Sequence, residues 1–89
     1  MVDDKGRGFA LYYLLNILVE NREAVYREVN ELLHQYSKCI ELRVGYPVKE
    51  EDVGIIVLIV RADNNTMGAF SGKLGQIKGI RVKSILIRR

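Results

Sequence analysis

The chain has 89 residues and a formal net charge of +3 at pH 7, with 48% hydrophobic and 28% charged residues. This composition excludes an intrinsically disordered chain, and the length suits one small domain. Such a domain buries roughly 60–65% of the surface that its unfolded chain exposes, so its stability margin is narrow unless a partner covers more apolar surface. The single cysteine, Cys39, cannot form an intramolecular disulfide, which favours a reducing cytoplasm.

The beginning of the chain combines a polar segment with an apolar run. We predict a flexible polar tail over residues 1–8 and a single domain over residues 9–89. The run FALYYLLNILV resembles a signal sequence, but Asp3 and Asp4 precede it and Asn16 interrupts it. It is also too short to cross a bilayer as a helix. The run is therefore predicted to form a buried strand over residues 9–19, and we expect no membrane partner.

A helix and a second strand are predicted next. Asn21 occupies a typical N-cap position, and an apolar stripe at helical spacing follows it: Val25, Val29, Leu32 and Tyr36. Residues 39–46 alternate as in a strand, with one face made of Ile40, Leu42, Val44 and Tyr46 and the other of Glu41 and Arg43.

The second half of the chain repeats this pattern. The segment GYPVKEED indicates a turn, and VGIIVLIVRA (53–62) indicates a third strand. The cluster Asp63, Asn64, Asn65 and Thr66 is typical of a helix start. This helix is predicted to run to about Ile77, followed by Gly79 and a last strand over residues 80–87.

The resulting order is strand-helix-strand-strand-helix-strand. It predicts an α+β fold, the ferredoxin-like βαββαβ sandwich, in which a four-stranded antiparallel sheet carries two helices on one face. The first and third strands are central in this arrangement, and the second and fourth are at the edges.

Both central strands are apolar on both faces, although two helices can cover only one face. We therefore predict a homodimer or homotetramer packed sheet against sheet. Each exposed apolar side chain that becomes buried in this contact would contribute about 1.5–3 kcal/mol to the free energy of association. The predicted interface consists of an apolar centre and a charged rim: Tyr12, Leu14, Leu18, Ile56, Leu58 and Val60, with Arg43 and Arg81.

The segment GAFSGKLG resembles a phosphate-binding loop, but its spacing excludes one. Three residues separate Gly68 from Gly72, and Leu74 follows Lys73 where a serine or threonine is required. Within a helix, Gly68, Gly72 and Gly75 would share one stripe, at a cost of about 0.8–1 kcal/mol each relative to alanine. A close approach by a ligand, a neighbouring subunit or a loop would explain the three glycines. Alternatively, the helix is short and loosens into a loop after Gly72.

A predicted ligand site combines this stripe with the loop after the first strand. Glu20, Asn21 and Arg22 lie in that loop, and the charge of Arg22 could hold an anionic group near the glycines of a neighbouring subunit. The turn formed by Gly45, Tyr46 and Pro47 is a second candidate, for a protein partner.

Catalysis and metal binding have little support in the sequence. His34 and Cys39 cannot make a structural zinc site by themselves, because such a site needs four ligands. We predict no metal, no cofactor and no enzymatic activity. The last basic residues leave nucleic-acid binding open as the alternative function, although the third strand has no aromatic residue for base stacking. These residues are Lys73, Lys78, Arg81, Lys83, Arg88 and Arg89.

Three segments carry a family resemblance: EVNELLHQYS, LRVGYPVKEE and TMGAFSGKLGQIKGIRVK. In this order they resemble the small regulators of iron-only hydrogenase systems, over residues 12–89. The resemblance implies an ACT-like domain, also related to the ligand-binding half of nickel-responsive regulators. Such domains self-associate and often bind small effectors between subunits. It therefore implies a regulatory or sensory oligomerisation module that binds an effector or a protein partner.

Overall fold

The structure is a computed structural model and describes residues 11–88. The predicted tail at residues 1–8 and the first two residues of the predicted first strand lie outside this range. The helices are α1 (Arg22–Gln35) and α2 (Asn64–Gly75). The strands are β1 (Leu11–Val19), β2 (Ile40–Val48), β3 (Val53–Ala62) and β4 (Ile80–Arg88). Short 3-10 turns, Ser37–Cys39 and Lys49–Glu51, precede β2 and β3.

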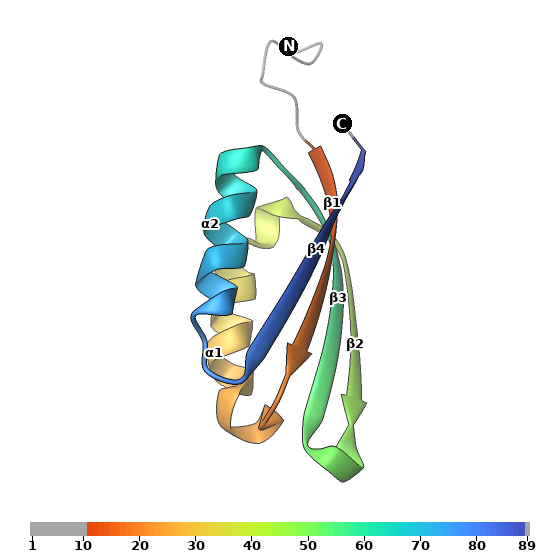
Figure 1. Ribbon diagram of the computed structural model, residues 1–89, viewed down its shortest axis with the longest axis vertical. Coiled ribbons are helices and arrows are strands. Elements are labelled where there is room, and N and C mark those ends of the chain that lie inside the picture. Colours follow the sequence, from red (N-terminus) through yellow and green to blue (C-terminus); the bar gives the residue numbers. More distant parts are fainter. Residues whose placement is uncertain (1–10, 89) are drawn as a thin grey trace.

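The predicted fold class is confirmed. All strand pairs are antiparallel, and the sheet order β2-β3-β1-β4 places β1 and β3 in the centre. Figure 1 shows α1 and α2 together on one side of the sheet, and within residues 11–88 no helix or strand lies on the other side. The fold is thus a two-layer ferredoxin-like sandwich with one uncovered sheet face.

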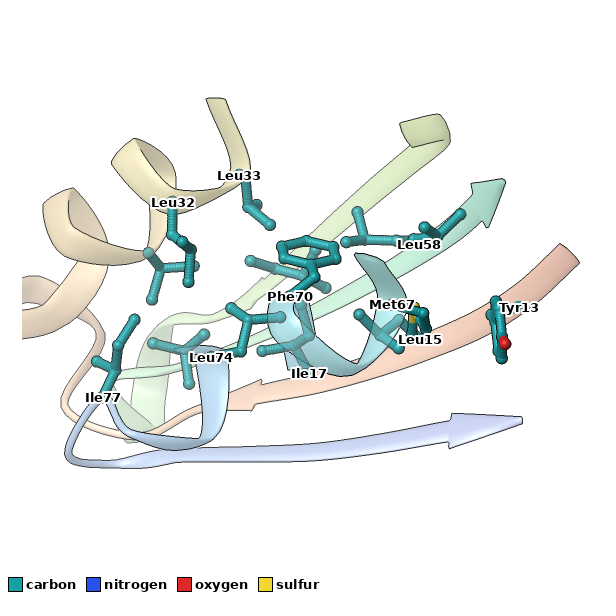
Figure 2. Packing of buried hydrophobic residues seen from close by; sticks show 14 of the residues in the cluster. Tyr13, Leu15, Ile17, Leu32, Leu33, Leu58, Met67, Phe70, Leu74 and Ile77 are labelled. Carbon is teal, nitrogen blue, oxygen red and sulfur yellow. The ribbon is translucent and has the colours of Figure 1, made fainter. Parts of the chain in front are cut away.

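The core fills the space between the two helices and the sheet (Figure 2). Met67, Phe70 and Leu74 of α2, and Ile77 just after it, recur at helical spacings of three and four and are all buried. From α1, the buried residues are Val25, Val29, Leu32 and Leu33. Tyr36, which follows α1, stacks on Phe70 with ring centroids 4.4 Å apart. The helical spacing in the sequence therefore located the inward faces of both helices.

The two helix starts are stabilised differently. The Asp63 side chain accepts a hydrogen bond of 2.7 Å from the Thr66 N–H, as expected of an N-cap residue. Asn21 also holds the N-cap position of α1, but its side chain makes no capping bond and its backbone is left-handed, with φ of 53°. The Asp52 carboxylate, from the turn before β3, instead accepts from the Glu23 N–H at 3.2 Å. The β2–β3 turn thus fixes the start of α1.

The strand β2 differs from its predicted form in two ways. It continues through Pro47 to Val48, so the predicted turn is shorter than expected. A β-bulge also interrupts its pairing with β3, because Ile40 pairs with Val60 whereas Leu42 pairs with Ile59. A bulge inserts one extra residue and reverses the alternation beyond it. Consequently Ile40 packs against the core, while Leu42 lies on the uncovered face.

Gly79 joins the end of the α2 segment to β4 and contacts the β1–α1 loop. Its φ is +86°, and a Cβ atom built there would lie 3.0 Å from the Glu20 carbonyl oxygen. We expect Gly79→Ala to lower the free energy of unfolding by about 1–2 kcal/mol, because a left-handed backbone is unfavourable for alanine. Urea denaturation of the variant and the wild type tests this value. An unchanged midpoint would contradict it.

Candidate functional site

The uncovered face of the sheet is the largest candidate site. Six of its apolar side chains are more than a third exposed: Tyr12, Leu42, Val44, Tyr46, Ile55 and Ile85. The pairing places Leu14 and Leu18 of β1 and Val57 and Ile59 of β3 on the same face. This set is called the open face below. Asn16 also lies on this face, but apolar side chains predominate over β1, β2 and β3. An exposed apolar surface of this kind is unusual for a monomeric domain and marks an interaction site.

Three predicted interface residues lie on the opposite side of the sheet. Ile56, Leu58 and Val60 are 5%, 0% and 0% exposed and belong to the core under the helices. Their placement in the interface was wrong. Since β3 is apolar on both faces, its alternation could not show which set faces the helices, and a one-residue choice exchanges the two sets. The open face instead receives Ile55, Val57 and Ile59.

Of the two residues of the predicted charged rim, Arg81 lies on the open face and Arg43 does not. Arg43 pairs with Leu58 and therefore lies on the helix side, where its Nη2 donates to the Asn30 side-chain oxygen at 2.6 Å. The prediction that Arg43 lies on the rim of the open face was also wrong, because the β-bulge between Ile40 and Leu42 reverses the alternation of β2 beyond it. Arg81 does lie on the open face, because it pairs with Leu18. It forms an exposed ion pair of 3.6 Å with Glu20, which contributes little to stability.

The open face is uneven in charge. The half formed by β2 and β3 is mainly apolar, whereas Arg81 and Lys83 of β4 bring two positive charges to the other edge. Lys73 lies on α2 and Lys78 in the turn after it, on neither of these strands. Within residues 11–88, the basic end of the chain is therefore divided between elements.

The three predicted site residues at the β1–α1 connection, Glu20, Asn21 and Arg22, make different contacts. The Glu20 N–H donates to the Gly79 carbonyl at 2.8 Å, and Asn21 accepts the first helical hydrogen bonds of α1 through its carbonyl. Arg22 alone extends along the protein surface, with its guanidinium 4.5 Å from the centre of the Tyr26 ring. It lines a small pocket together with Gly45, Tyr46 and Pro47. Two candidate sites that the sequence suggested separately are thus adjacent.

The predicted glycine stripe lies elsewhere, on the outer side of α2. Gly68, Gly72 and Gly75 are exposed, and a Cβ atom at each would meet no atom within 4 Å. None of the three lines the pocket of Arg22. Their approach to the loop of a neighbouring subunit stays a prediction.

A single added methyl group tests whether a partner closely approaches the glycine stripe of α2. If no partner approaches α2, Gly72→Ala should raise the free energy of unfolding by about 0.5–1 kcal/mol, because alanine favours the helix and the site has room. Thermal denaturation measures the change. A lower stability, or a change in the mass of the assembly, would show that a close contact requires glycine there.

Residues with catalytic or metal-binding chemistry are dispersed. His34 is exposed on α1, and Cys39 is half-buried in the turn before β2. Within residues 11–88, no three His, Cys, Asp or Glu side chains lie close enough to hold a metal ion. In the same range, no helix is long and apolar enough to cross a membrane.

These features define a small ferredoxin-like α+β domain whose candidate sites are an apolar sheet face and a basic pocket. The chain belongs to the TM1266-like family, described as "Iron-only hydrogenase system regulator, putative", whose profile matches residues 12–84. A solved structure, that of the uncharacterized protein TM1266 from Thermotoga maritima, is similar with a TM-score of 0.85 and 57% sequence identity. The match covers 89% of this chain and 99% of that one. No curated protein is detectably similar to the chain.

Proposed function

We propose that the protein is a non-enzymatic regulatory module of an iron-only hydrogenase system and works in the cytoplasm as a homo-oligomer. The family supports the link to the hydrogenase system, since its description names a regulator. The observation that carries the proposed assembly is the open face, whose apolar side chains have no cover within residues 11–88.

The energetics of the open face favour a second copy as its cover. Fully burying one aliphatic or aromatic side chain contributes about 1.5–3 kcal/mol, and forming a complex costs an estimated 4–15 kcal/mol. The six side chains are 36–65% exposed, so each gains roughly half of this amount when it is buried. A dimer buries all six on both subunits, and the sum is then comparable to the cost. In a two-fold dimer the same surface is used twice, so one apolar face meets another.

Charge indicates which part of the open face forms the contact. Arg61, Arg81 and Lys83 would repel their copies if they lay at the centre of a two-fold interface. We place the centre of the contact on β2 and β3, around Val44 and Val57, which pair with each other in the sheet. The basic residues of β4 then lie at the rim, where water solvates them. A small effector or a protein partner would act by changing this assembly.

The proposal is tested in an organism that carries an iron-only hydrogenase. Deleting the gene should change hydrogenase activity or transcript level, and the wild-type chain should restore it. Val57→Lys, which disrupts the open face, should fail to restore it. Ala69→Lys makes the same kind of change at an exposed position of α2 and should restore it fully. A deletion without effect, or full restoration by Val57→Lys, would overturn the proposal.

A further inference from the structure

A small pocket lies on the helix side of the sheet, where the start of α1 meets the end of β2 and the start of β3. Its volume is about 110 Å³, and its walls include Arg22, Tyr26, Arg43, Gly45 and Pro47. Pockets for drug-sized ligands have volumes of about 300–1,000 Å³, so this one suits a single small group. Two arginines from distant parts of the chain line it.

Arg22 is held in place by packing on both sides. Its guanidinium lies over the Tyr26 ring at 4.5 Å, a favourable cation–π geometry. Its aliphatic part passes over Gly54, where an added Cβ would lie 3.3 Å from the Arg22 Cδ. The missing side chain at residue 54 therefore leaves room for Arg22. A fixed guanidinium loses less side-chain entropy when a ligand binds.

Arg43 is fixed by a second chain of contacts. It donates to Asn30 at 2.6 Å, and Asn30 lies two helical turns after Arg22. A hydrogen bond from Asn30 lowers the pKa of Tyr26, despite some desolvation, and the charges of Arg43 and Arg22 lower it further. The Tyr26 hydroxyl therefore lies in a positive potential that both arginines produce.

The positive charge of the pocket has no partner among the described residues. The ion pair found within residues 11–88 joins Arg81 to Glu20 and involves neither Arg22 nor Arg43. The Asp52 carboxylate accepts from the Glu23 N–H at the start of α1 and does not line the pocket. Each guanidinium offers five N–H donors, of which Arg43 uses one nitrogen on Asn30.

From this geometry we propose that the pocket binds a small oxyanion, the phosphate or carboxylate group of a metabolite, between the guanidinium groups of Arg22 and Arg43. Guanidinium groups bind both kinds of oxyanion through paired N–H donors. Gly45 is part of the pocket wall, and a Cβ atom built there would meet no atom within 4 Å. The site is built within one subunit and does not depend on the proposed self-association.

Isothermal titration calorimetry with inorganic phosphate and with acetate tests the proposal, in chloride buffer at constant ionic strength. The wild type should bind at least one of the two, and the preferred probe assigns the class of oxyanion. Arg22→Gln and Arg43→Gln should each weaken binding at least tenfold. Arg27→Gln removes the same charge from the same helix outside the pocket and should leave binding unchanged.

Two further variants separate the site from general charge effects. Gly54→Val retains both arginines but pushes Arg22 aside, and Gly45→Leu adds a large side chain to the pocket wall. Both should weaken binding at least tenfold while circular dichroism shows a folded protein. Failure of the wild type to bind either probe would overturn the proposal, as would an equal loss of affinity in Arg27→Gln. If the wild type bound a probe but were a monomer, the proposed oxyanion site would be supported and only the proposed self-association would be contradicted.

Discussion

Replacing Leu58 with alanine is expected to lower the free energy of unfolding by about 2–5 kcal/mol. Leu58 is 0% exposed and pairs with Leu15, another fully buried residue, at the centre of the sheet. The substitution removes buried carbon atoms and leaves a cavity that the neighbouring strands cannot close. A domain of this length has a total stability of about 4–13 kcal/mol, so the loss is a large share.

Thermal denaturation measures this effect, which corresponds to a fall in Tm of roughly 10–30 °C. The matched control is Val57→Ala, one residue earlier on the same strand. Val57 lies on the open face, at the centre of the proposed contact, so both variants are compared at a dilution at which the protein is monomeric. There the truncation of Val57 should reduce the free energy of unfolding by less than about 1 kcal/mol. Similar losses in the two variants would contradict the assignment of faces on β3.

Val57→Lys is expected to weaken self-association on the order of 100-fold or more. Our proposal places Val57 at the centre of the contact, where a lysine would be buried without a partner and near its own copy. Leaving a charge unpaired in an interface costs about 2–5 kcal/mol, and each 1.4 kcal/mol is a factor of ten in the dissociation constant. The fold should persist, because residue 57 does not face the helices.

Sedimentation equilibrium over a dilution series measures the dissociation constants of the wild type and of Val57→Lys. Ala69→Lys supplies the control for an added lysine at an exposed position. Only Val57→Lys should shift the equilibrium toward the monomer. If both variants behaved like the wild type, the contact would have to lie outside the open face.

The fold could be predicted because each element carries a strong local signal. The stripe that includes Val25 and Val29 located α1, and Met67 and Phe70 located α2. The order of the elements then left few arrangements of the sheet. Asn21 showed where α1 begins, but the hydrogen bond from the Glu23 N–H to the Asp52 carboxylate could not be predicted, since these two residues are 29 positions apart in the chain.

The faces of the strands could not be predicted with the same success. On β3, Ile56 and Val57 are equally apolar, so only packing against the helices decides which is buried. On β2, the bulge near Glu41 places Ile40 and Leu42 on opposite faces, against the simple alternation. The sequence contains no clear signal for a bulge at that point.

The residues of the basic pocket could also be predicted only in part from the sequence. Arg22 and the turn beginning at Gly45 were predicted as two separate candidate sites, because one is charged and the other has turn residues. Tyr26 was not predicted to belong to any site, and Arg43 was assigned to the rim of the oligomer interface rather than to a ligand site. The long-range approach of β2 to α1 brings these residues together, and local patterns carry no information on such contacts.

Native mass spectrometry of the purified wild type at several concentrations determines whether a second copy covers the open face. We expect a dimer or tetramer that dissociates into single chains under denaturing conditions. A monomer at every concentration would contradict it, because the open face would then remain exposed without a second copy to cover it.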